Sequence, residues 1–254
     1  MVNMAAHLEF QNVSVAYGGK QALDGISLAV PPNTVLGIVG PANSGKTTLL
    51  KTINRTIEFV PGARVSGSTR IHGTDVREMK DVYDLRRRIG MVFPLPVGLP
   101  MSIYDNVAYA PRRAGIANKA ELEAIVERCL KLAVLWDEVK DRLDLLGTRL
   151  SGGQQQRLTL ARALSLDPEI LCLDEFSIAI DPVTTMRIED VLKELRKSIS
   201  IILVTNLTQQ ARRLADRTMF LWNGRIIEID KTDVIFSSRA KSQQTKDYVS
   251  GEFG

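Results

Sequence analysis

The residues best suited to chemistry lie between Gly40 and Thr47, where the sequence is GPANSGKT. They match the pattern G-x-x-x-x-G-K-[ST], whose glycines let the backbone wrap around a phosphate group. Backbone N–H groups and the N-terminus of a following helix would bind the phosphate oxygens. Lys46 is expected to reach the β- and γ-phosphates, and Thr47 to place its hydroxyl on Mg²⁺. The stretch therefore predicts a nucleotide-binding loop.

Two adjacent carboxylates, Asp174 and Glu175, directly follow the apolar run Ile170–Leu173. Asp174 would lie at the C-terminal end of a buried strand, where it can hold the Mg²⁺ shell. Glu175 could orient and deprotonate the water that attacks the γ-phosphate. Strands often end in solvated acids, so this pair is informative because a complete phosphate loop precedes it. Lys46 and Glu175 are the predicted catalytic residues.

Three apolar runs predict the strands that position these residues: Val35–Val39, Ile170–Leu173 and Ile201–Val204. Each run is continuous, which suits a parallel sheet covered by helices on both faces. Helical spacing follows in two places, at Leu160, Ala163 and Leu164 and at Ile188, Val191, Leu192 and Leu195. Alternating strands and helices predict an α/β fold.

The N-terminal part differs from this pattern. Leu8–Tyr17, Ile26–Val30 and Val65–His72 are predicted strands of an antiparallel β element, with a turn at Tyr17–Lys20. Residues 102–145 are mostly helical in pattern and predict an inserted helical subdomain. The polar tail from about Ser237 is expected to be a mobile or peripheral end.

These elements predict one domain over residues 1–254, with a P-loop core built on a mainly parallel sheet. The core and its antiparallel β subdomain are expected in 1–93 and 168–236, the helical subdomain in about 94–167, and the tail in 237–254.

Composition is that of a globular protein, with 44% hydrophobic and 24% charged residues. The net charge of +4 permits a basic patch, but an ordinary mixed-charge surface explains it better.

Cys129 and Cys172 lack metal-ligand spacing, so we expect no zinc site and a reducing compartment. We see neither a signal peptide nor an apolar run of about 18 residues that could cross a membrane. We therefore expect a protein that is soluble as made and reaches a membrane only by docking onto another chain.

A third motif, LSGGQ at Leu150–Gln154, lies shortly before the acidic strand end. With this motif the chain resembles the ABC ATPases over residues 8–230. Ser151 and the N–H groups of Gly152 and Gly153 can contact a γ-phosphate at the start of a helix. The resemblance implies a head-to-tail dimer, with each ATP between the phosphate loop of one subunit and the LSGGQ motif of the other.

The resemblance also implies individual contacts. Tyr17 resembles the aromatic residue that stacks on adenine. The alternative is that Tyr17 is an ordinary tyrosine at the end of a strand. Asp181 resembles the D-loop aspartate that crosses the dimer interface. The implied ATP contacts are Tyr17, Gly40, Pro41, Ala42, Asn43, Ser44, Gly45, Lys46, Thr47, Thr48 and Asn206. The implied contacts across the dimer are Ser151, Gly152, Gly153, Gln154 and Asp181. The implied Mg²⁺ ligands are Thr47 and Asp174.

Two further stretches, Val60–Val65 and Pro100–Tyr109, resemble the ATPase of bacterial phosphate importers, although related importers share such stretches. The second lies where this family contacts its transmembrane subunit. The resemblance implies a subunit on the inner face of the cell membrane that hydrolyses ATP to power phosphate import. Its implied partners are permease subunits and a second ATPase subunit, identical or a paralogue, and not nucleic acid.

Three positions depart from the family pattern. Pro94 stands where the family has a glutamine, and proline offers neither a side-chain oxygen nor a backbone donor. Asn206 stands where the family has a histidine, and an amide cannot become a cation or move a proton. Ile178 replaces a residue with a hydroxyl group. We expect ATP binding to survive, and hydrolysis to be slower by a factor on the order of 10² or more.

Three hypotheses follow, and we favour the first, an importer ATPase. The second is a degenerate nucleotide-binding subunit with slow or no hydrolysis, regulatory or paired with an active paralogue. The third is a soluble ABC ATPase that acts on nucleic acid or ribosomes. Such proteins usually contain two ATPase modules or a long coiled-coil insert, whereas this chain has one phosphate loop, one LSGGQ motif and no heptad run. Turnover of the purified chain with Mg²⁺ distinguishes the first hypothesis from the second.

Overall fold

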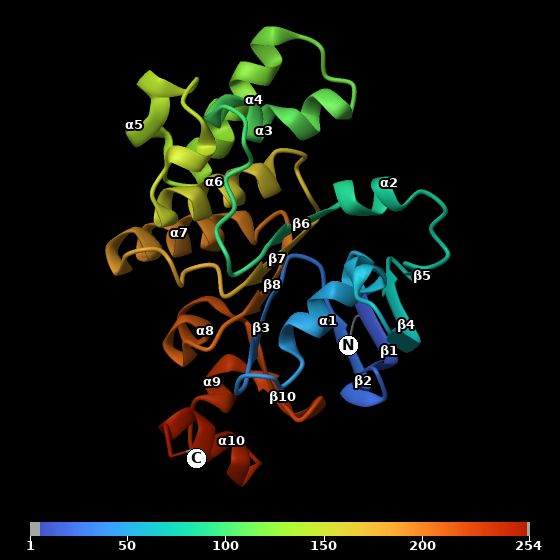
Figure 1. Ribbon diagram of the computed structural model, residues 1–254. Helices are drawn as coiled ribbons and strands as arrows, with labels where there is room; N and C mark the ends of the chain where they lie inside the picture. Colours follow the sequence, from blue (N-terminus) through green and yellow to red (C-terminus); the bar gives the residue numbers. More distant parts are fainter. Residues whose placement is uncertain (1–5, 253–254) are drawn as a thin grey trace. The chain divides into compact units, whose positions relative to one another are not determined.

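The computed structural model describes residues 6–252 (Figure 1). They form two compact units, which are described separately. The first unit comprises residues up to 86 together with those from 196 onward, and the second comprises Arg87–Leu195. Among the described residues, no helix has both the length and the apolar character that crossing a membrane requires.

The first unit contains two sheets, whose strand orders are β2-β1-β4-β5 and β10-β9-β3-β8. Its strands are β1 (Leu8–Tyr17), β2 (Lys20–Val30), β3 (Val35–Val39), β4 (Ala63–Ile71), β5 (Thr74–Asp75), β8 (Ser200–Val204), β9 (Arg217–Trp222) and β10 (Arg225–Lys231). Its helices are α1 (Lys46–Ile53), the short 3-10 helix η1 (Thr56–Phe59), α2 (Val82–Arg87, at the boundary), α8 (Thr208–Leu214), α9 (Thr232–Ile235) and α10 (Gln243–Ser250).

The two sheets of this unit differ in direction. The β1 strand pairs antiparallel with both β2 and β4. The β3 strand pairs parallel with β8 and β9, while β10 runs antiparallel to β9. Every residue of β3 and β8 is buried, as their unbroken apolar runs require.

The second unit is mostly helical (Figure 1). Its elements are β6 (Ile89–Val92), α3 (Ile103–Arg113), α4 (Lys119–Leu132), α5 (Trp136–Val139), η2 (Lys140–Arg142), η3 (Gly147–Arg149), α6 (Gly152–Leu164), β7 (Ile170–Asp174) and α7 (Pro182–Leu195). The β6 and β7 strands form a parallel pair. Polar side chains start three of the helices: Ser102, Asn118 and Ser151 each accept a hydrogen bond from a backbone N–H three residues later.

The predicted α/β fold with an antiparallel β element is confirmed. The β2 strand begins at Lys20 rather than at Ile26. Its register against β1 shifts between the pairs Val13–Ile26 and Val15–Leu23, where Gly25 has a φ of 65°. This bulge interrupts the alternation of buried and exposed side chains, so the sequence of the first half of the strand lacks the apolar–polar alternation that would predict it.

The described part of the predicted mobile or peripheral tail contains a helix that is anchored to the rest of the first unit. Residues Gln243–Ser250 form α10, in which Thr245 is completely buried. The carboxylate of Glu228 on β10 accepts the N–H groups of Lys241 (2.8 Å) and Ser242 (3.0 Å) just before this helix. The last two residues of the predicted tail, Phe253 and Gly254, lie outside the described residues.

Candidate active site

The phosphate loop joins β3 to α1 in the first unit. Its backbone has positive φ at Gly40 (153°), Asn43 (61°) and Gly45 (103°). A Cβ atom at Gly40 would lie 2.0 Å from the carbonyl oxygen of Leu221. A Cβ atom at Gly45 would lie 2.6 Å from the carbonyl oxygen of Ala22. Only glycine fits both positions, so the motif's two glycines follow directly from the path of the loop.

Lys46 is folded against this loop. The residue is 6% exposed, and its Nζ donates hydrogen bonds to the carbonyl oxygens of Gly40 (2.7 Å) and Pro41 (2.8 Å). The cation therefore lies against the backbone of the loop. Ala42 and Asn43 are exposed, which leaves the outer part of the loop open to a ligand.

Ser44 provides the observation that fits a phosphate group to the loop. The residue is 2% exposed, and its Oγ has no hydrogen-bond partner among residues 6–252. Buried hydroxyl groups in proteins are nearly always hydrogen-bonded. A phosphate oxygen within the loop would supply the acceptor that this hydroxyl lacks.

Two predicted ATP contacts flank the loop. Tyr17 ends β1, and its hydroxyl donates to Oγ1 of Thr48 in α1 at 3.2 Å, so the tyrosine lies beside the helix that follows the loop. Asn206 is exposed and lies two residues beyond the end of β8. The β3 and β8 strands are parallel, and Val204 pairs with Ile38. The segment that contains Asn206 therefore begins at the same edge of the sheet as the phosphate loop.

The two predicted acids lie in the second unit. Asp174 is the last residue of β7 and is 1% exposed. Glu175 follows it, is half-buried and has a φ of 47°. A bulky residue in this left-handed region costs roughly 1–3 kcal/mol, and such strain is concentrated at functional sites. Other non-glycine residues, such as Arg55 and Val134, also have a positive φ, so the backbone at Glu175 does not by itself identify a site.

The LSGGQ motif forms the start of α6. Ser151 is exposed and caps the helix, accepting the N–H of Gln154, while the Gln154 side chain accepts the N–H of Ser151. Gly152 is also exposed, and a Cβ atom there would meet nothing within 4 Å. A Cβ atom at Gly153 would lie 2.8 Å from the carbonyl oxygen of Ala179. The helix start is thus open at Gly152 and closely packed at Gly153.

Glu138 is a residue of this region that the sequence did not indicate. Its carboxylate accepts hydrogen bonds from Arg157 (2.6 and 3.0 Å) and from Nε2 of Gln154 (2.8 Å). The hydrogen bonds from Arg157 hold the pKa of the Glu138 carboxyl below its usual value, outweighing burial, which raises it. Glu138 therefore anchors both the last residue of the LSGGQ motif and the cation one turn further along α6.

We expect Glu138→Gln to destabilise the protein by about 1–2 kcal/mol, between the values for exposed and buried ion pairs. The substitution would leave the charge of Arg157 without its carboxylate partner, although only 7% of the Arg157 side chain is exposed. The effect should stay below that of a fully buried pair because the Glu138 side chain is 42% exposed. Because folding lowers the pKa of Glu138, its contribution is present above the unfolded value, about 4.3, and is lost as pH falls through the folded value. Thermal unfolding at pH 7 and at pH 4 measures this difference.

The control is Glu123→Gln, which removes an exposed pair with Lys119 at 3.7 Å in the same unit. It should change stability by less than about 0.5 kcal/mol. Equal effects of the two substitutions, or a Glu138 effect that is unchanged at pH 4, would contradict the anchoring role.

Asp181 caps the next helix. Its Oδ1 accepts the N–H of Thr184 at 2.9 Å at the start of α7, and this hydrogen bond lowers the pKa of the Asp181 carboxyl. Ile178, one of the departures from the family pattern, is 68% exposed in the loop before it. Both side chains are accessible to a partner, as a contact across a dimer would require.

Pro94 lies in a loop after β6 where neighbouring apolar side chains are exposed. Phe93, Leu95 and Val97 are 37%, 77% and 51% exposed. The carbonyl of Phe93 accepts a hydrogen bond from Nε2 of the buried Gln156 at 2.9 Å. The amide nitrogen of Gln156 therefore fixes the backbone before Pro94, whereas its buried Oε1 has no hydrogen-bond partner among residues 6–252.

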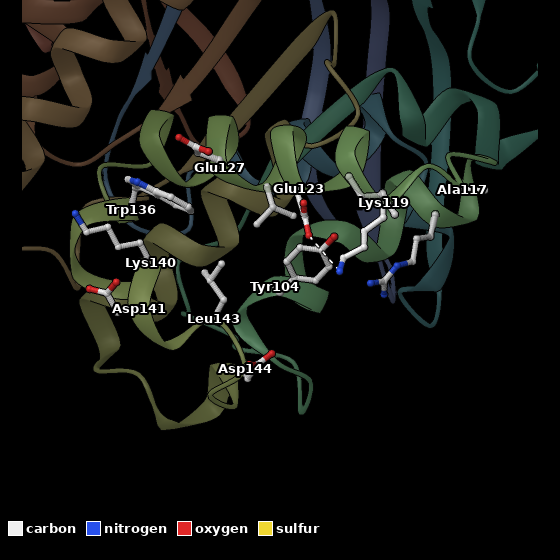
Figure 2. Close-up of a pocket in the computed structure, with 13 residues that line it drawn as sticks. Tyr104, Ala117, Lys119, Glu123, Glu127, Trp136, Lys140, Asp141, Leu143 and Asp144 are labelled. Carbon is white, nitrogen blue, oxygen red and sulfur yellow. Dashed lines mark ion pairs between the residues drawn. The ribbon is translucent and has the colours of Figure 1, made fainter.

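A hollow of about 780 Å³ lies among α3, α4 and the segment after α5 (Figure 2). Tyr104, Trp136 and Leu143 supply apolar groups, and Lys119 and Glu123 form an ion pair on its wall. None of the predicted ATP-site residues lines it. Tyr104 belongs to the segment Pro100–Tyr109 that is predicted to contact a transmembrane partner.

Comparisons with known proteins identify the family of this chain. The family model for ABC transporters matches residues 23–177. One similar solved structure is a dimeric ATP-binding cassette protein in a post-hydrolysis state with bound ADP and Pi. It is 27% identical with a TM-score of 0.78, over 89% of this chain and 98% of that chain.

A second similar structure is a bacterial Atm1-family ABC exporter with ATP bound. It is 24% identical with a TM-score of 0.84, over 100% of this chain and 43% of that chain, and at this identity it shows the fold alone. The fold and the phosphate loop define a P-loop NTPase core. The chain belongs to the ABC transporter family and is an ABC ATPase domain.

Proposed function

We propose that the chain binds MgATP at its phosphate loop and hydrolyses it to power the membrane subunits of an ABC transporter. The buried Ser44 hydroxyl, which lacks a hydrogen-bond partner among the described residues, is the observation that favours a phosphate ligand most directly. The ATP contacts are those of the loop from Gly40 to Thr48, with Tyr17 on adenine and Asn206 near the γ-phosphate.

The reaction follows from the groups already described. Thr47 and Asp174 would hold Mg²⁺, which offsets the charge of the phosphate oxygens. Lys46 would exchange its two carbonyl acceptors for phosphate oxygens, which as anions form stronger hydrogen bonds. Glu175 would take a proton from the attacking water as the γ-phosphate bond to the leaving oxygen breaks.

A second ATPase subunit is expected to complete each site. Ser151, Gly152, Gly153 and Gln154 would contact the nucleotide of the partner, with Asp181 crossing the interface. The exposure of Ser151 and Gly152 at the start of α6 favours this role. A similar protein at 27% identity is a dimer with ADP and Pi, which supports the same assembly here.

Transport of inorganic phosphate into the cell is our proposal for the coupled process. It depends on Val60–Val65 and Pro100–Tyr109, which resemble the phosphate importer ATPase. The solved exporter shares only the fold with this chain, so it does not favour export. We expect the hollow beside Tyr104 to receive a segment of the permease on the cytoplasmic face of the membrane. Co-purification of the chain with phosphate permease subunits, and its loss in Tyr104→Ala, would test this contact.

The alternative, a degenerate subunit, is favoured by Pro94 and Asn206. We expect the purified chain to hydrolyse ATP slowly, and Pro94→Gln combined with Asn206→His to raise kcat by about 10–10²-fold, since each restores a positioned polar group. Steady-state ATP hydrolysis with Mg²⁺ measures this, with Pro96→Gln as the control in the same loop.

The outcomes separate the two functions. Measurable turnover by the native chain supports an ATPase that works without the usual glutamine and histidine. ATP binding with no turnover, followed by revival in the double variant, would instead identify a degenerate subunit that needs an active partner.

A further inference from the structure

The C-terminal helix α10 reaches the phosphate loop of its own unit through Tyr248. The Tyr248 ring stacks on Phe220 of β9, with 4.7 Å between ring centroids and an angle of 21° between the rings. Its hydroxyl accepts a hydrogen bond from the backbone N–H of Gly40 at 3.1 Å. Phe220 is fully buried and packs in one cluster with Val39 and Ala211, so the tyrosine is joined to the core at the end of β3.

Gly40 is the point at which β3 ends and the phosphate loop begins. Its N–H is bound by Tyr248, and its carbonyl accepts from Lys46. The residue is buried, and a side chain there would collide with the backbone of Leu221. Small movements of this peptide therefore change both the path of the loop and the position of the Lys46 ammonium group.

The turn between β9 and β10 makes another contact with the same loop. The carbonyl of Ser44 accepts the N–H of Gly224, in the turn between β9 and β10, at 3.1 Å. The same Gly224 accepts, through its carbonyl, the N–H of Asp24 at 2.8 Å. The β9–β10 pair thus supports the far side of the loop, and Tyr248 supports its first residue.

The start of α10 is fixed independently of Tyr248. Glu228 of β10 accepts the N–H groups of Lys241 and Ser242, and Thr245 is buried one turn before Tyr248. The helix is therefore held at one end by a carboxylate and at the other by a ring and a hydroxyl. Removing the Tyr248 hydroxyl should leave the helix in place and change mainly the contact to Gly40.

We propose that Tyr248 is a positioning residue for ATP binding, whose hydroxyl holds the first peptide of the phosphate loop in its ligand-binding conformation. The proposal depends on the phosphate loop being the ATP site, as proposed above. Its physical basis is preorganisation: without the tyrosine oxygen, the buried Gly40 N–H lacks this acceptor, and the loop shifts to find another.

The test is Tyr248→Phe in the full chain, because phenylalanine keeps the stacking on Phe220 and removes only the hydroxyl. We expect the Kd for ATP to rise by about 3–10-fold, and the KM for ATP to rise in parallel with little change in kcat. The melting temperature should stay close to that of the native chain. Tyr83→Phe is the control, since Tyr83 is 70% exposed.

A second measurement separates positioning from general loosening. In NMR spectra of glycine-labelled protein, amide hydrogen exchange at Gly40 should speed up in Tyr248→Phe while exchange in the centre of β3 does not. An unchanged Kd would overturn the proposal, and so would a weaker Kd with unchanged exchange at Gly40.

The Lys46→Ala variant distinguishes this inference from the proposed function. If the native chain binds ATP, Lys46→Ala weakens binding and Tyr248→Phe does not, only the role of Tyr248 fails. If the native chain binds no ATP, or Lys46→Ala binds it as well as the native chain, the ATP site itself is wrong and the role of Tyr248 is wrong with it.

Discussion

Lys46→Ala should weaken ATP binding by about 10²-fold or more, because it removes a cation that lies against the phosphate loop. Hydrolysis at subsaturating ATP should fall at least as far. The substitution also removes the donor to the carbonyls of Gly40 and Pro41, so the loop loses an internal contact as well as a ligand contact. Titration with a fluorescent ATP analogue and steady-state hydrolysis measure the two effects separately.

Lys51→Ala is the matched control. Lys51 is in the last turn of the same helix, α1, so the substitution makes the same change of charge and helix propensity away from the loop. We expect its ATP affinity to stay within about twofold of the native value, since surface substitutions away from such features have small effects. Similar losses in both variants would mean that general charge, and not the loop contact, governs binding.

Local geometry explains why the phosphate loop was predictable from sequence. Gly40 and Gly45 are required by backbone conformation and by contacts with Leu221 and Ala22. Lys46 follows in the same eight-residue stretch, so the whole motif can be identified from consecutive residues. The buried strands β3, β7 and β8 were equally predictable, because strands covered on both faces need continuous apolar runs.

The anchors of the site could not be predicted in the same way. Glu138 and Arg157 are 19 residues apart, and Tyr248 and Gly40 are 208 residues apart. Glutamate on a short helix and tyrosine in a polar tail are ordinary surface residues until the tertiary fold places them. The α10 segment has no long apolar stripe; Thr245 is its buried residue, and Tyr248 packs against the cluster of Val39, Ala211 and Phe220. Sequence patterns therefore identify groups that act on a ligand more readily than groups that hold them in position.

Glu175→Gln should lower kcat for ATP hydrolysis by about 10²–10⁴-fold, the range for loss of a positioned general base. Glutamine has nearly the same shape and accepts hydrogen bonds, but it cannot take a proton from water. Because the two side chains have nearly the same shape, the amide should occupy the place of the carboxylate at the same left-handed φ of 47°. ATP affinity should therefore change by less than about threefold, as expected for a group that acts in the transition state.

The control for this substitution is Glu121→Gln, the same chemical change on an exposed residue in the first turn of α4. It should leave kcat and the ATP Kd unchanged. If the chain forms the proposed dimer, Glu175→Gln should also accumulate as a dimer in the presence of MgATP, because the nucleotide that joins the subunits is no longer consumed. Size-exclusion chromatography with and without ATP detects this. A Glu175→Gln variant that hydrolyses ATP at the native rate would remove Glu175 from the mechanism and leave proton transfer to another group.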